Sequence, residues 1–198
     1  MKNHTYQVHI SLRDSEPEIW RRLLVPADML LPDFHRVIQS SMGWLNMHLH
    51  HFADGKTFYL LRSPDDEFWD ELDNVEYNDV KLSDLIKNEE DSIIYEYDFG
   101  DGWMHDIVLE RILPVDTKFQ YPICVDGQMN CPPEDCGGIW GYSELLEILK
   151  NPDHEQYEDT IDWLGGEFDP EYFNKDEVNQ LLREKDFGCT DLDDGSSL

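Results

Sequence analysis

Apolar and polar positions alternate along three pairs of segments in the first 115 residues, a period typical of half-buried β-strands. In the second and third pairs, Asp54-Gly55 and Gly100-Asp101-Gly102 supply the backbone freedom that a tight turn needs. The pattern therefore predicts three β-hairpins. They pair residues 6–12 with 19–25, 48–52 with 56–61, and 92–99 with 103–113.

A helical period separates the first two hairpins. Between Leu31 and Trp44 apolar side chains recur at three- and four-residue spacing, and Gly43 is a typical helix stop. Residues 81–86 predict one further helical turn, which Ser83 is available to cap. The acidic, turn-rich residues 63–80 predict an exposed loop.

The sequence changes in character after residue 115. Residues 122–138 are dense in Cys, Pro and Gly and predict a loop, and helical patterns follow over 142–149, 155–164 and 169–183. The predicted fold class is α+β, with a mixed or antiparallel sheet of hairpins and one packed helix, β-grasp-like at its start, followed by a helical C-terminal part. We expect a single domain over 1–185, made of a sheet-rich part (1–115) and a part of loop plus helices (116–185), and then a disordered acidic tail over 186–198.

The formal net charge is −29, and it is unevenly distributed. Residues 1–50 carry five acids and five bases, whereas residues 51–149 carry 24 acids against six bases. A field of this sign repels phosphate backbones, so we expect a basic protein or peptide partner or a bound cation, and no direct nucleic-acid binding. No stretch reaches the roughly 20 apolar residues of a membrane helix, and residues 1–6 lack a secretory apolar run, which predicts a cytoplasmic protein without a membrane span.

The first candidate cluster for chemistry is His48-Leu49-His50-His51-Phe52. In a strand, His48 and His50 would share one face, and two imidazoles so placed are a common way to hold a transition metal. The alternative is a pair of histidines that are hydrogen-bonded or that face solvent.

The second cluster surrounds the turn of the third hairpin. Asp98 and Asp101 flank its glycines, and Trp103 and His105 share a strand face directly after it. Carboxylate and imidazole groups at one hairpin end can bind a cation or exchange protons. Alternatively, the two aspartates bond only backbone amides of the turn.

The third cluster is the loop Cys131-Pro-Pro-Glu-Asp-Cys-Gly-Gly138, in which two prolines and two glycines would hold Glu134 and Asp135 in place. The thiols of Cys124, Cys131 and Cys136 do not have the spacing of an ordinary zinc ribbon. Whether these cysteines bind a metal or stay free thiols is open at this point. A disulfide framework is not expected in a chain with an adequate core.

At these clusters the chain resembles the plasmid ORF-3-like family, the Ri-plasmid type that is also labelled insertion-element passenger protein. The resemblance implies a shared compact α+β fold and brings no activity, cofactor or partner with it. The motifs that carry it are Glu18-Ile-Trp-Arg-Arg22, His48-Leu-His-x-Phe52, Tyr95-x-Tyr-Asp-Phe-Gly-Asp-x-Trp-x-His105, Pro132-Pro-Glu-Asp-Cys-Gly-Gly138, Gly141-Tyr142 and Phe168-Asp-Pro170.

Because the recognisable motifs are polar, we expect them to meet in the folded chain. The predicted pocket comprises His48, His50, Asp98, Asp101, Trp103, His105, Glu134 and Asp135. Three functional interpretations remain open. The protein is a non-catalytic binding or accessory module, a metal-dependent hydrolase or other metalloenzyme, or a protein whose motif residues serve folding alone.

In the metalloenzyme interpretation, one divalent transition metal is bound by His48, His50 and His105. Glu134 or Asp101 would then act as a general base, and Trp103 would form a wall of the pocket.

Overall fold

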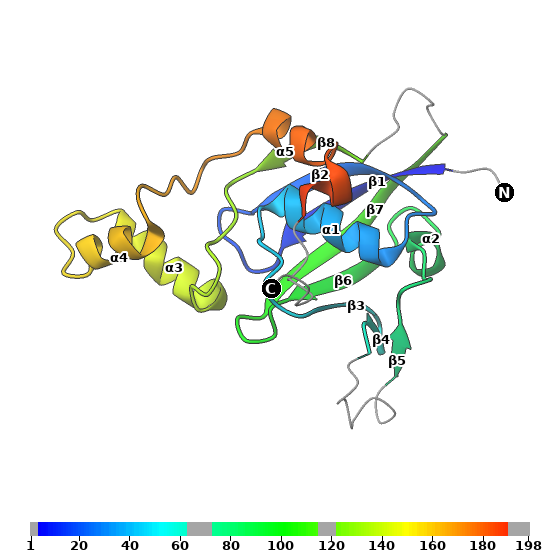
Figure 1. Ribbon diagram of the computed structural model, residues 1–198, viewed down its shortest axis with the longest axis horizontal. Helices are drawn as coiled ribbons and strands as arrows, with labels where there is room; N and C mark the ends of the chain where they lie inside the picture. The colour runs from blue at the N-terminus through cyan, green and yellow to red at the C-terminus, as the bar shows by residue number, and fades with distance from the viewer. Residues whose placement is uncertain (1–3, 63–72, 115–121, 190–198) are drawn as a thin grey trace, which may run out of the picture.

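Eight β-strands form one sheet in the computed structural model, which describes residues 4–62, 73–114 and 122–189. Their order across the sheet is β5-β4-β3-β6-β7-β1-β2-β8, and each neighbouring pair is antiparallel except β4 with β5 (Figure 1). The strands are β1 (His4–Leu12), β2 (Trp20–Pro26), β3 (His50–Asp54), β4 (Thr57–Leu60), β5 (Asn74–Glu76), β6 (Ser92–Tyr97), β7 (Trp103–Pro114) and β8 (Ile123–Gln128).

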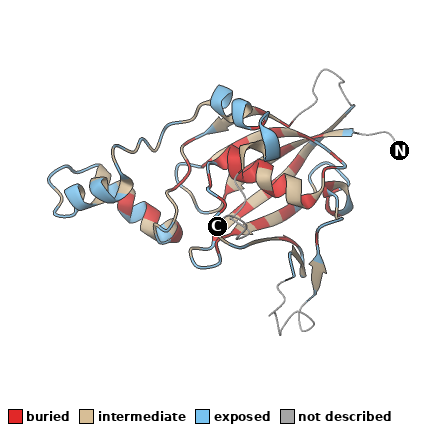
Figure 2. Cartoon of the chain, in the orientation of Figure 1, coloured by how far each residue is buried: buried red, intermediate tan, exposed pale blue. Residues whose placement is uncertain are grey.

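Alternation along the strands gives the sheet one buried face and one more polar face. In β1 the side chains of Val8 and Ile10 are fully buried, and the intervening residues are only half-buried. On the more polar face, the guanidinium of Arg22 binds the Glu110 carboxylate at 2.7 Å. Burial is concentrated in the sheet and in the helix α1 that covers it (Figure 2).

Helix α1 (Leu31–Met42) packs Phe34, Val37 and Ile38 into the core and ends at Gly43, whose φ of 114° is in the left-handed region. The buried Arg21 side chain of β2 completes this end of the helix. It donates to the carbonyl oxygens of Ser41 (2.7 Å) and Met42 (3.2 Å) in α1, and to those of Trp20 and Gln128 (both 2.8 Å) in the sheet. A cation at a helix C-terminus also opposes the negative end of the helix dipole.

The other helices are shorter or lie at the edge of the sheet. The turn α2 (Leu82–Leu85) packs beside the start of α1, with Leu82 fully buried. Helices α3 (Gly138–Leu149) and α4 (Tyr157–Leu164) extend away from the sheet, whereas α5 (Lys175–Leu181) and the 3₁₀ turn η2 (Lys185–Gly188) return to it beside β8 and α1 (Figure 1). No residue of α4 is buried, so α4 adds little to the core.

Polar side chains occupy part of the core below α1. His105 is completely buried, its Nδ1 lies 3.0 Å from the carbonyl oxygen of Trp103, and its Nε2 accepts from the indole N–H of Trp44 at 3.2 Å. His50 stacks on His35 with ring centroids 3.5 Å apart, and its Nε2 lies 2.8 Å from the hydroxyl of Tyr77. Burial lowers the pKa of His105 to about 4 and places that of His50 well below its ordinary value.

The predicted α+β class is confirmed, as are the three hairpins, the packed helix and its stop at Gly43. Two strands were missed. β5 lies within the predicted loop 63–80 and β8 within the predicted loop 122–138, and both are edge strands that depend on a partner rather than on their own propensity.

Other boundaries differ as well. Strand β3 begins at His50, two residues later than predicted, and α5 covers only part of the predicted helix 169–183. The turn η2 extends into the predicted disordered tail. Residues 190–198 of that tail and residues 63–72 of the predicted loop lie outside the described residues. None of the helices in the described ranges is long and apolar enough to span a membrane.

Replacing Arg21 with Met is expected to lower the free energy of unfolding by about 3 kcal/mol, because buried carbonyl groups at the end of α1 lose their donors. Arg22→Met is the matched control on the same strand. It removes a partly exposed ion pair and should cost about 1 kcal/mol. Urea unfolding of both variants measures the difference, and equal losses would contradict the role of Arg21.

Acidification is expected to destabilise the protein between pH 6.5 and pH 4 through His105. In this window the unfolded chain binds a proton that the folded chain does not, so the free energy of unfolding falls as the pH falls, by about 3 kcal/mol in total. His105→Gln should therefore be less stable at pH 7.5 but show a shallower loss below pH 6.5. Urea unfolding at several pH values tests this, and parallel pH profiles would refute it.

Candidate functional site

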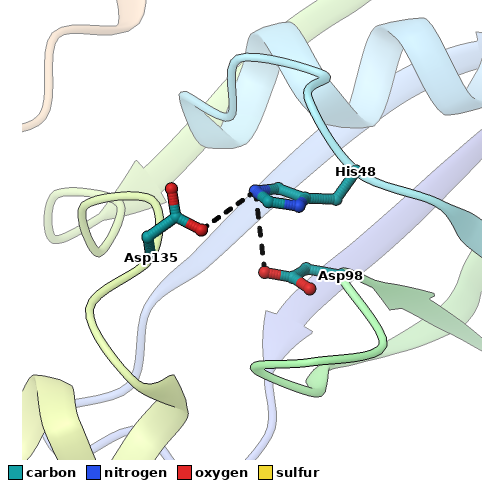
Figure 3. A group of neighbouring side chains, drawn as sticks. All are labelled: His48, Asp98 and Asp135. Carbon is teal, nitrogen blue, oxygen red and sulfur yellow. Dashed lines mark ion pairs between the residues drawn. The ribbon is translucent and has the colours of Figure 1, made fainter.

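Three segments that are distant in the sequence meet at one end of the sheet. His48 lies in a bend before β3, Asp98 follows β6, and Glu134 and Asp135 lie in the loop between β8 and α3. The Nε2 atom of His48 is 3.7 Å from Asp98 Oδ2, 3.7 Å from Glu134 Oε2 and 3.4 Å from Asp135 Oδ1. Figure 3 shows the imidazole edge directed at the carboxylates of Asp98 and Asp135.

The hairpin turn after β6 fixes the Asp98 carboxylate. Asp98 has a left-handed φ of 55°, its Oδ1 accepts from the Gly100 N–H at 2.9 Å, and its carbonyl oxygen accepts from the Gly102 N–H. One carboxylate oxygen therefore holds the turn, and the other, Oδ2, is directed at His48. The Asp98 N–H also donates to the carbonyl of Leu49 at 2.9 Å, which joins the turn to the His48 segment.

The segment that carries His48 is held by α1. Asn46 adopts a φ of 55°, and its N–H donates to the side-chain oxygen of Gln39 at 2.8 Å. Its Oδ1 lies 2.9 Å from Nε2 of His35, a second helix residue. The direction of His48 is thus set by buried polar groups of α1 and not by a strand register.

Glu134 connects all three segments through its Oε1 atom. This oxygen accepts from the Leu45 N–H at 2.7 Å and from the Tyr97 hydroxyl at 2.9 Å, and the same hydroxyl accepts from the Met47 N–H at 2.9 Å. Burial raises the pKa of Tyr97 above its ordinary value, which keeps this hydroxyl a neutral donor. The Glu134 side chain is only 9% exposed, and these two hydrogen bonds fix its Oε1 atom.

The loop between β8 and α3 is pressed against the hairpin turn. Asp101 Oδ2 accepts from the Gly137 N–H at 3.1 Å. Gly138 has a φ of 67°, and a Cβ there would clash with the carbonyl oxygen of Asp101. A glycine at position 138 therefore allows the loop to lie directly against the turn.

Two polar atoms at the centre of this site lack a hydrogen-bond partner within the described part of the chain. They are Nε2 of His48 and Oε2 of Glu134, and both are inaccessible to solvent. Unsatisfied buried polar atoms cost about 1–3 kcal/mol each, and in native proteins they commonly indicate a missing water or ion. Here they face each other across 3.7 Å.

Three donor side chains of the site lie close enough together to be candidate ligands of one metal ion. His48, Asp98 and Asp135 each offer one ligand atom, all within 4.8 Å of one another, and they form the sole such group of three or more His, Cys, Asp or Glu side chains among the described residues. Two ligands bonded tetrahedrally at about 2.0–2.2 Å lie about 3.3–3.6 Å apart. The observed separations from His48, 3.4 and 3.7 Å, are close to this range.

The eight residues predicted to share a pocket fall into two groups. His48, Asp98, Glu134 and Asp135 lie together, and Asp101 lies beside them as the residue that holds Gly137. Trp103 and His105 are buried in the core instead, with Trp103 only 1% exposed, and the half-buried His50 packs on His35.

The predicted ligand set His48, His50 and His105 is consequently not assembled. His50 and His105 direct their ring nitrogens at Tyr77 and Trp44, away from His48. The physical reason is the bend before β3. Strand alternation would place His48 and His50 on one face, but the strand starts at His50, so His48 follows a different path.

Tyr97 was not predicted as part of the site, although its hydroxyl holds Glu134. Its alternation with Tyr95 on β6 and its position directly before Asp98 are signals in the sequence that could have pointed to it. Two of the cysteines are protonated thiols. Burial raises the pKa of the Cys124 thiol to about 11 and that of Cys136 to about 12, so both are thiols at neutral pH.

Comparisons with known proteins agree with the motifs. The chain is 35% identical over 178 residues to the uncharacterized protein y4hQ of Sinorhizobium fredii, covering 89% of each sequence. It is similar to the crystal structure of the protein of unknown function MM3350 from Methanosarcina mazei, with a TM-score of 0.80, 38% identity, and coverage of 89% of this chain and 97% of that one. A family model matches residues 4–177, and the chain therefore belongs to the plasmid pRiA4b ORF-3-like family.

Proposed function

We propose that this protein binds one divalent transition-metal ion through His48, Asp98 and Asp135, with Glu134 beside the ion. The observation that carries the proposal is the inaccessible Nε2 of His48, which has no hydrogen-bond partner in the described ranges while carboxylate oxygens lie 3.4–3.7 Å away. A divalent cation would satisfy this nitrogen and offset the repulsion among the carboxylates.

The donor set favours some metals over others. One imidazole and two carboxylates suit zinc, manganese or iron, whereas calcium and magnesium prefer sites made only of oxygen. Three protein ligands leave a coordination position open, which is typical of zinc sites that act on a substrate or a water. The unpartnered Oε2 of Glu134 would be available to accept a hydrogen bond from such a water, in keeping with a role as general base.

Asp135 gives this site access to solvent. Its side chain is 65% exposed, whereas those of Asp98 and Glu134 are only 10% and 9% exposed. An ion could therefore enter and leave from the Asp135 side without opening the core.

The alternative without a metal is a charged imidazole among carboxylates, which would give an ion-pair cluster with no dependence on added metal.

Calorimetric titration with ZnCl2 and MnCl2 is expected to show one site per chain in protein purified without a histidine tag and treated with EDTA. Metal at a hundredfold excess over its Kd should raise the free energy of unfolding by about 2.7 kcal/mol.

Asp135→Asn should weaken metal binding at least about tenfold without unfolding the protein, because the side chain is exposed. Asp28→Asn removes an exposed carboxylate elsewhere and serves as the control. Absence of both heat and thermal stabilisation with either metal would overturn the proposal.

The contact between the β8–α3 loop, which carries Glu134 and Asp135, and the hairpin turn after β6 gives a second test of the metal site. Gly138→Ala is expected to displace the loop and weaken metal binding by more than about tenfold, because its Cβ would clash with the Asp101 carbonyl. Gly165→Ala is the matched control. Gly165 has a similar φ of 73°, but a Cβ there meets nothing within 4 Å, so it should cost only about 1–2 kcal/mol of backbone strain. The docking model is wrong if both variants bind metal equally well.

A further inference from the structure

A hollow with a volume of about 360 Å³ lies between α3 and α4, next to the Asp135 end of the site. Its apolar lining comes from Leu145 and Ile148 of α3 and from Trp163 of α4. Its acidic lining comes from Asp135, Glu144 and Asp159, and no Lys, Arg or His is among the lining residues. A hollow of this size can hold a long side chain or a small ligand.

The electrostatic potential in the hollow is negative, because three carboxylates line it and no basic side chain does. Glu144 and Asp159 do not belong to any group of metal-ligating side chains in the part of the chain that the structure describes. The carboxylates are therefore suited to an extended organic cation rather than to a second metal ion.

Trp163 adds a surface that recognises such a cation. It lines the hollow and is 53% exposed, so part of its ring system is accessible to a ligand. An ammonium or guanidinium group gains cation–π energy over an indole, and its alkyl stem can pack on Leu145 and Ile148.

Exposed apolar side chains on the neighbouring segments indicate that the cationic group belongs to a partner protein. Leu49 (71% exposed) follows His48, Phe99 (47%) follows Asp98, and Trp140 (85%) lies in the first turn of α3. Exposed aromatic and aliphatic groups around a charged centre are typical of surfaces that bind other proteins. A free amine would leave these groups uncovered.

We infer that the hollow between α3 and α4 binds a lysine or arginine side chain presented by a basic segment of a partner protein. The carboxylates of Glu144 and Asp159 bind the cationic head, and Trp163 packs against it. This inference does not rest on the proposed metal site, because the hollow is formed by α3 and α4, and Asp135 is the one residue shared with the metal ligands.

The test uses the full chain, uniformly ¹⁵N-labelled and treated with EDTA. N-acetyl-arginine methylamide and N-acetyl-lysine methylamide should shift the indole N–H resonance of Trp163, which Trp163→Phe assigns by its loss. N-acetyl-citrulline methylamide has nearly the shape of the arginine probe without its charge, and it should bind at least about fivefold more weakly. Equal binding of the citrulline and arginine probes would overturn the inference.

Two double variants distinguish the local effect of the carboxylates in the hollow from the general effect of the protein's negative charge. Glu144→Gln with Asp159→Asn should weaken binding of the arginine probe by about tenfold. Glu18→Gln with Asp28→Asn removes the same formal charge from exposed positions outside the hollow and should weaken it less than twofold. Equal effects of the two double variants would show a general field effect and refute the site.

The free amines agmatine and cadaverine form the last arm of the experiment. Both lack the flanking amide groups of a polypeptide. If they bind more tightly than the two methylamide probes, the hollow recognises a free amine and the assignment to a partner protein is wrong. Binding of the methylamides at least as tightly as the free amines supports the assignment.

Discussion

The site depends on the Glu134 carboxylate, which holds together segments separated by up to 89 residues of sequence. One oxygen accepts from the Leu45 backbone and from the Tyr97 hydroxyl. These two bonds connect the loop before α3 to the segment after α1 and to β6. Hydrogen bonds to a carboxylate are stronger than neutral ones, so these two bonds hold the loop against the other two segments. The second oxygen is then held in place facing His48.

Placing three carboxylates close together lowers the stability of the folded state, and the formal net charge of −29 adds to this repulsion. Asp98, Glu134 and Asp135 surround one imidazole, and two of these side chains are about nine-tenths buried. Burying like charges without compensation opposes folding, and the backbone donors at Gly100 and Leu45 compensate only one oxygen of each buried carboxylate. The other oxygen of each buried carboxylate faces His48 and accepts no hydrogen bond from these backbone donors. A ligand with positive charge is the simplest physical reason for a fold to keep them there.

The pattern of apolar and polar residues predicted the three hairpins and helix α1, because these elements depend on residues that are close in the sequence. Strand alternation, the helical period of α1 and the stop at Gly43 each depend on a few neighbouring residues, and each was predicted from them. The edge strands β5 and β8 were missed because their pairing partners, β4 and β2, lie elsewhere in the sequence. For the site, the acidic pair Glu134-Asp135 and the turn residue Asp98 could be nominated from the sequence, because prolines, glycines and tight turns constrain them locally. The separation of His48 from His50 could not, because it depends on Asn46 binding Gln39 and on Asp98 binding the Leu49 carbonyl, which are tertiary contacts.

The metal site and the hollow share Asp135, and this has a thermodynamic consequence if both proposals hold. A cation bound to Asp135 neutralises one of the carboxylates that make the hollow attractive to a basic side chain. Metal and partner would then weaken each other's binding, and linkage requires the same factor in both directions. A coupling of about 1–3 kcal/mol is typical of such linked sites, and a protein with this coupling would release its partner as the metal concentration rises. The Asp135 side chain is 65% exposed and could be reached from both proposed sites, whereas Asp98 and Glu134 are buried and would contact only the proposed ion.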